Sequence, residues 1–159
     1  MMNFEVIKRN KGKKVLVEIH HDGKLIGCRS SHRAYRFALV VKPCQAAALA
    51  RAKSNFAWNE KQATEYYLTL NHDGEDRKNA IRQYGRARIE GWLADGTYAK
   101  WVVSHREMVS KAEKEIARLS AGPLPEFEQL YVSSFHQSRK NVPDVGQHQI
   151  FVAVVEIPE

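Results

Sequence analysis

The sequence has few cysteines and no long apolar stretch, and these shortages exclude several classes of protein. Cys28 and Cys44 cannot build a disulfide framework, and a structural zinc site would need histidine ligands besides them. The longest apolar stretches, 37–41 and 150–155, are far shorter than the roughly 20 residues that cross a bilayer. Residues 1–5 lack the basic-then-apolar pattern of a signal peptide. We therefore expect reduced thiols and a cytoplasmic protein without a membrane partner.

Motifs of the common catalytic and cofactor sites are also missing. The sequence contains no G-x-x-x-x-G-K-[ST] phosphate loop, no G-x-G-x-x-G turn and no G-x-S-x-G nucleophile elbow. His20, His21 and Asp22 are consecutive, but successive strand residues point to opposite faces, so only His20 and Asp22 can converge. We expect no cofactor and no metal site.

One of the seven histidines carries half of a two-histidine phosphodiesterase motif. His136 and Ser138 fit His-x-Ser, whereas none of the other six histidines has Ser or Thr two positions later. Such enzymes use one imidazole as the base and a second as the acid at phosphorus, so one motif is incomplete. An alternative hypothesis is therefore a small phosphodiesterase or nuclease in which folding brings a second histidine, such as His20, to His136.

Hydrophobic periodicity predicts an α+β fold, and the length of 159 residues suits a single domain over 1–159. Alternating apolar residues predict an N-terminal antiparallel meander with strands at 4–9, 15–19, 24–29 and 35–41. Asp22-Gly23 is a dipeptide favoured in tight hairpin turns. Two C-terminal strands, 127–136 and 148–157, complete a sheet on which the helices pack.

Helices are expected between these two groups of strands. A helical pattern begins after Pro43 and runs to Leu70, as one helix or two, and another runs from about residue 76 to 94. A strand is expected at 97–103. Ser104 and Glu107 fit a capping box, which would start a further helix and leave His105 facing solvent.

The net charge of +7 is unevenly distributed along the chain. Residues 120–159 contain two basic and five acidic residues, so residues 1–119 carry +10. Three basic clusters lie in this positive part: hairpin-tip lysines Lys11, Lys13 and Lys14; Arg29, Arg33 and Arg36 around Tyr35; and a helical stripe of Lys78, Arg82 and Arg86. Guanidinium, ammonium and aromatic groups are those that contact phosphates and bases. Glu75 and Glu90 beside the stripe are also typical of a solvated helix face.

Residues 29–41 resemble a stretch found in small phage and prophage proteins, in which a Trp/Ser-led helix follows, as residues 101–119 would here. The resemblance implies an accessory protein of a mobile element, a class rich in inhibitors of host defences and small nucleic-acid binders.

These observations favour a non-enzymatic binding protein that engages nucleic acid or a nucleoprotein complex through its three basic clusters. A third hypothesis is an inhibitor whose positive face docks on an acidic protein surface.

Overall fold

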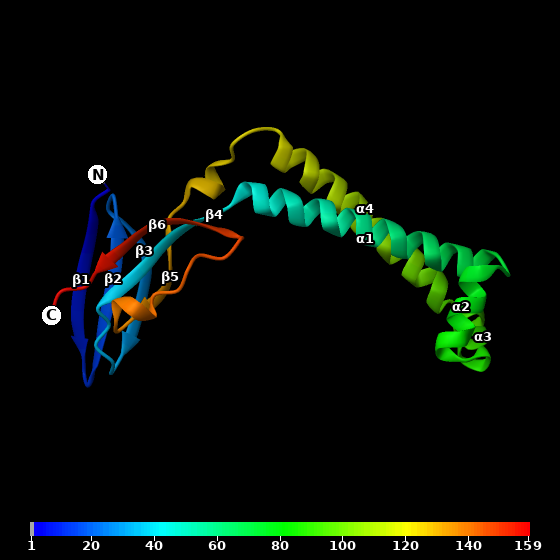
Figure 1. The fold of residues 1–159 in the computed structure, drawn as a ribbon, viewed down its shortest axis with the longest axis horizontal. Helices are drawn as coiled ribbons and strands as arrows, with labels where there is room; N and C mark the ends of the chain where they lie inside the picture. Colours follow the sequence, from blue (N-terminus) through cyan, green and yellow to red (C-terminus); the bar gives the residue numbers. More distant parts are fainter. Residues whose placement is uncertain (1) are drawn as a thin grey trace. The chain divides into compact units, whose positions relative to one another are not determined.

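A computed structural model describes residues 2–159 and confirms the α+β class (Figure 1). The described residues form four α-helices and two three-stranded antiparallel sheets. Contacts divide the chain into two compact units. We call them the β unit, which contains the residues up to Ala47 together with Pro123–Glu159, and the helical unit, Ala48–Gly122. A single domain over 1–159 stays a prediction.

The first sheet contains β1 (Phe4–Lys11), β2 (Lys14–His21) and β3 (Lys24–Ser31), in that spatial order. The prediction of a hairpin turn at Asp22-Gly23 is confirmed. Asp22 has a φ of 50° and Gly23 a φ of 77°, as the tight hairpin turn requires at both central positions. Val17 and Ile19 point into the core, as their alternation predicts.

The second sheet corrects the prediction of a four-stranded meander. β4 (Phe37–Pro43) does not continue the first sheet but lies between β5 (Tyr131–His136) and β6 (Gln149–Glu156). Residues 38–41 are at most 2% exposed, which suits a central strand buried on both faces. β5 starts later than expected because Pro125–Glu128 form a 3₁₀ turn, η1; a second one, η2, spans Arg139–Asn141.

The core of the β unit lies between its two sheets. Val17 and Ile19 from the first sheet pack with buried residues that include Ala38 and Val40 of the second. Strands β3 and β5 approach so closely at Gly27 that a Cβ atom there would lie 2.5 Å from the Cβ of Val132. Only glycine therefore fits this crossing without a shift.

The helical unit contains most of α1 (Gln45–Asn71), followed by α2 (Glu75–Tyr84), α3 (Arg86–Ala94) and α4 (Thr97–Ser120). Of the alternatives for 44–70, the structure shows one helix. The expected helix 76–94 is wrong, because Gly85, with a φ of 94°, separates α2 from α3. The expected strand 97–103 and the helix start at Ser104 are also wrong, because α4 begins at Thr97 and runs through both.

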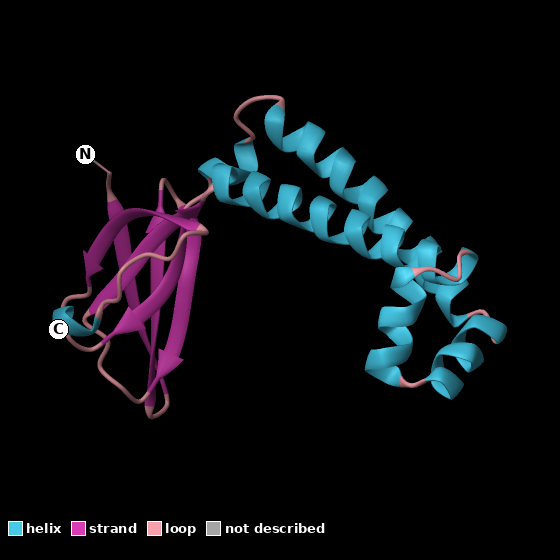
Figure 2. Cartoon of the chain, turned by 45° about the vertical axis from the view of Figure 1, so that its right-hand side comes forward, coloured by secondary structure: helices cyan, strands magenta, loops and turns pink. Residues whose placement is uncertain are grey.

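Helices α1 and α4 lie side by side and antiparallel (Figures 1 and 2). Their buried and half-buried residues recur at alternating intervals of three and four, which is the spacing of a coiled-coil seam. On α1 these are Leu49, Ala52, Phe56, Asn59, Ala63, Tyr66 and Leu70, and on α4 they are Tyr98, Val102, His105, Val109, Ala112, Ile116 and Leu119. Tyr98 and Val102 are buried in this seam. Their packing favours a helix in the first turns of α4 although these turns contain β-branched residues.

Aromatic rings connect the short helices to this hairpin. The ring of Trp92 on α3 lies 5.6 Å from Tyr84 of α2 and 5.4 Å from Trp101 of α4. Trp101 also lies 5.2 Å from Tyr66 of α1, so the cluster joins all four helices. No helix in residues 2–159 combines the length and apolar character needed to cross a membrane.

The chain leaves the β unit and returns to it at neighbouring points. The side-chain oxygen of Gln45 accepts a hydrogen bond of 3.0 Å from the backbone N–H of Leu124. Between these two residues, Ala48–Gly122 make up the helical unit.

Candidate nucleic-acid interface

The structure brings the first two basic clusters of the β unit to one end of the first sheet. The β1–β2 pairing ends with Lys11 opposite Lys14, and β3 ends at Ser31, opposite Val15. Just beyond, the Nδ1 atom of His32 lies 3.1 Å from the backbone oxygen of Lys13. The β1–β2 turn and the segment that follows β3 therefore adjoin, at the lower end of these strands in Figure 1.

Five exposed cations gather at this place, and we call them the basic end: Lys11, Lys13, Lys14, Arg29 and Arg33. Within residues 2–159, no carboxylate lies within salt-bridge distance of any of them. By contrast, nearby Arg9 lies 3.6 Å from Glu18. The charge of the basic end is therefore not neutralised within the protein, which is what a surface for polyanions requires.

Two predicted binding residues have structural contacts of their own. Arg36 donates hydrogen bonds to Glu159 at 2.7 Å and to the backbone oxygen of Ile157 at 3.2 Å. Tyr35 is only 8% exposed, and its ring packs 5.8 Å from that of Phe135. The guanidinium of Arg29 lies 5.3 Å from the centre of the Tyr35 ring. Tyr35 thus positions Arg29 by a cation–π contact and presents no open face for stacking.

The third cluster differs from the first two in its partners. Lys78 lies 3.8 Å from Glu75, and Arg86 lies 3.8 Å from Glu90. Arg82 donates a hydrogen bond of 3.0 Å to Asn79. Because Gly85 ends α2, these cations do not form a stripe on one helix, and their contacts are those of a solvated surface.

Two cations that the sequence reasoning missed follow β5 in the β unit. Arg139 and Lys140 lie in η2, just after β5, whose last residue His136 pairs with Phe37 next to Arg36. Neither has a carboxylate at salt-bridge distance in the described part of the chain. They were missed because they stand in the acidic C-terminal segment, and no sequence pattern indicated that β5 pairs with β4. Two acidic residues lie beside Arg36: Glu156, the last residue of β6, pairs with Phe37, and Glu159 forms an ion pair with Arg36.

The structure does not assemble the alternative catalytic site. The Nε2 atom of His136 lies 2.7 Å from the hydroxyl of Ser134, a neighbour on the same strand, rather than from Ser138. His20 lies in the other sheet, next to the turn at the opposite end of β2, where its Nε2 atom is 3.8 Å from Glu18. Among residues 2–159, no group of three or more His, Cys, Asp or Glu side chains is arranged to hold a metal.

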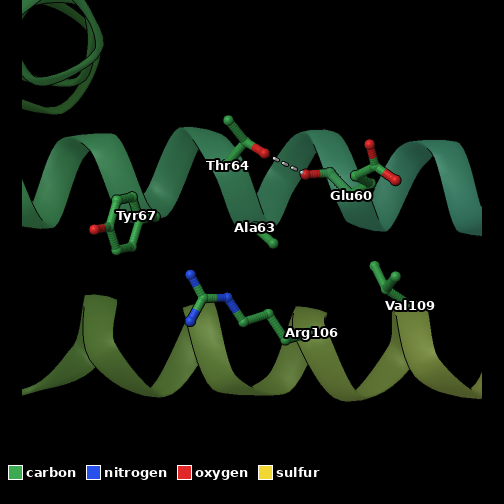
Figure 3. A pocket seen from close by; sticks show the side chains of 6 residues that line it. All are labelled: Glu60, Ala63, Thr64, Tyr67, Arg106 and Val109. Atoms are coloured by element: carbon green, nitrogen blue, oxygen red, sulfur yellow. Dashed lines mark hydrogen bonds between the residues drawn. The ribbon is translucent and has the colours of Figure 1, made fainter.

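Two of the hollows in the structure have charged residues in their walls. One, of about 240 Å³, lies between α1 and α4 (Figure 3) and is lined by Glu60, Ala63, Thr64, Tyr67, Arg106 and Val109. There the guanidinium of Arg106 lies 5.2 Å from the centre of the Tyr67 ring. The other, of about 420 Å³, is in the β unit, and its walls include the ion pair Lys42–Glu128 and His21, whose Nε2 atom lies 3.2 Å from a carboxylate oxygen of Asp22.

No protein-family model matches the chain, and no curated protein or solved structure matches it either. The class is therefore defined by the structure itself. It is an α+β protein with a basic end on its β unit and an antiparallel helical hairpin, α1 and α4, in its helical unit.

Proposed function

We propose that this protein is a non-enzymatic nucleic-acid-binding protein whose basic end binds the phosphate backbone. The observation that supports this most directly is the 3.1 Å contact between His32 and the backbone oxygen of Lys13. It joins two clusters that are well separated in sequence into one surface of five cations without carboxylate partners. An accessory role for this binding in a mobile element, on bare nucleic acid or on a nucleoprotein complex, stays a prediction from the resemblance of residues 29–41.

The two kinds of side chain at the basic end serve different contacts. Arg29 and Arg33 present planar guanidinium groups that bind a phosphate through two parallel hydrogen bonds. The three lysines act as point charges and tolerate variation in backbone position. Each phosphate that these cations neutralise releases condensed counterions, so affinity should fall steeply as salt increases.

A titration of labelled duplex and single strands at several salt concentrations tests the proposal. We expect K11Q/K13Q/K14Q to reduce the slope of log affinity against log salt by about one unit per lost phosphate contact. The matched control is K78Q/R82Q/R86Q, which removes the same formal charge from α2 and α3 and should leave the slope unchanged.

Three outcomes decide between the hypotheses. An equal loss in both triple variants would show that net charge, and not the basic end, governs binding. No binding at low salt would overturn the nucleic-acid proposal and leave an acidic protein surface as the better explanation of the charge. H136A should retain full binding, whereas the phosphodiesterase alternative requires it to abolish turnover.

A further inference from the structure

Trp58 of α1 is 58% exposed, more than any other large hydrophobic side chain in the described residues. Its ring is nevertheless anchored, because it meets the ring of His105 at 5.5 Å and an interplanar angle of 70°. His105 is itself held by a hydrogen bond of 2.8 Å to Asn59, and Asn59 donates to the backbone oxygen of Asn55. Trp58 is thus a large aromatic surface that is both open to solvent and held in place.

Beyond the ring of His105, which it contacts, Trp58 shares the exposed side of α1 with polar and charged residues. Arg51, Asn55 and Gln62 stand seven before, three before and four after Trp58, so they share its side of α1. Arg51 has no carboxylate at salt-bridge distance among residues 2–159. The acidic residue on this side, Glu65, lies 4.0 Å from Lys61.

This composition distinguishes between two kinds of partner. A protein interface surrounds its aromatic hot spot with further apolar side chains that exclude water, and charged residues are depleted at its core. A binding site for single strands instead combines an aromatic face, on which a base stacks, with cations for the backbone and polar groups for base edges. Trp58, Arg51, Asn55 and Gln62 provide the second combination.

We propose that Trp58 is a base-stacking residue for single-stranded nucleic acid. The inference rests on the proposed function and adds the form of nucleic acid that is preferred. Stacking on Trp58 needs an unpaired base, because bases in a duplex already stack on one another. The contribution of Trp58 is therefore confined to single strands, whereas the basic end binds the backbone of either form.

The test compares a labelled oligothymidylate with a duplex of the same length at low salt. W58A should weaken binding of the single strand by about 5- to 150-fold, the effect of losing one base–aromatic stack. Affinity for the duplex should change by less than about twofold. F151A, which truncates another exposed aromatic residue, of the β unit, is the matched control and should bind both forms like the wild type.

Tryptophan fluorescence gives a second measurement that does not depend on truncating the side chain. The single strand should quench the fluorescence of the wild type, and W58F should lose that quenching while it retains the fold. Retained single-strand affinity in W58A, or quenching that persists in W58F, would overturn the inference and leave the proposed function standing. An equal loss of duplex affinity in W58A would overturn it too. A wild type that binds neither form would overturn both proposals.

Discussion

Asn59 of α1 and His105 of α4 form a hydrogen bond of 2.8 Å inside the seam of the helical hairpin. Asn59 is only 5% exposed, and its amide also donates to the backbone oxygen of Asn55 at 2.8 Å. A polar pair in an otherwise apolar seam specifies the register of two helices, because any shift leaves both groups buried without partners. His105 therefore has a structural role, and the prediction that it faces solvent is wrong.

Replacing only one member of this pair should destabilise the hairpin. We expect N59L to lower the free energy of unfolding by about 1–3 kcal/mol, because the half-buried His105 loses its hydrogen-bond partner. N59L/H105L should recover that loss, since two apolar residues suit the seam. Denaturant unfolding measures both. N71L is the control: Asn71 makes a similar bond to the backbone oxygen of Tyr67, but it is exposed, so its loss should cost no more than about 0.5 kcal/mol.

Replacing Ser104 by alanine should not destabilise the protein, although the loss of a helix cap would. Ser104 is exposed in the middle of α4, where alanine has the higher helix propensity. S104A should therefore leave the protein unchanged or stabilise it by up to about 0.5 kcal/mol. A loss of about 0.5–2 kcal/mol in a thermal or denaturant melt would instead indicate a capping role.

Gly27 should be intolerant of any side chain. G27A places a Cβ atom 2.5 Å from the Cβ of Val132, which is too close for a β-branched residue to adjust cheaply. We expect a loss of about 1–3 kcal/mol in denaturant unfolding. G27A/V132A should lose less than the sum of the two single variants. As a control, G91A on α3 meets nothing within 4 Å and should stabilise the protein by about 0.5–1 kcal/mol.

The carboxylate of Asp95 at the start of α4 should make the stability of the protein fall in acid. Asp95 accepts hydrogen bonds from the Thr97 hydroxyl at 2.6 Å and from its backbone N–H at 2.9 Å, and these bonds lower the pKa of Asp95. Because the pKa is lower in the folded state, this stabilisation is present above the unfolded value of about 4 and is lost as pH falls through the folded value. D95N should therefore be less stable than the wild type at pH 7.

The difference between D95N and the wild type should narrow as pH falls below about 4. Thermal midpoints measured from pH 7 to pH 2 check this. The pKa of Glu115 is also lowered, by its hydrogen bond with Arg118, but Glu115 is present in both proteins, so the difference isolates Asp95. A constant difference across this range would contradict the role of Asp95.

The strands of the first sheet were predictable because their signals are local. Val15, Val17 and Ile19 alternate with their neighbours, and Val17 and Ile19 are buried as expected. Asp22-Gly23 requires only that two adjacent residues adopt positive φ. Hydrophobic alternation does not show which strands are neighbours in a sheet. For that reason β4 was assigned to the wrong sheet.

The helical hairpin and the basic end were less accessible to sequence reasoning. The α1 seam includes Ala52, Asn59 and Ala63, which are too small or too polar to form an apolar stripe. The two basic clusters were identified, but their contact depends on His32 reaching Lys13, nineteen residues away. Arg139 and Lys140 follow β5, and only the pairing of β4 with β5 brings the end of that strand to Phe37.

The hydrogen bond between Gln45 and Leu124 joins the point at which the chain leaves the β unit to the point at which it returns. The length of the hairpin between them is therefore not constrained by the sheets. Because its seam repeats every seven residues, evolution or design can add one heptad to α1 and one to α4 and keep every facing pair in step. A heptad added to only one helix would separate Asn59 from His105 and leave the buried amide of Asn59 without its partner. The pair therefore disfavours changes of length in one helix alone.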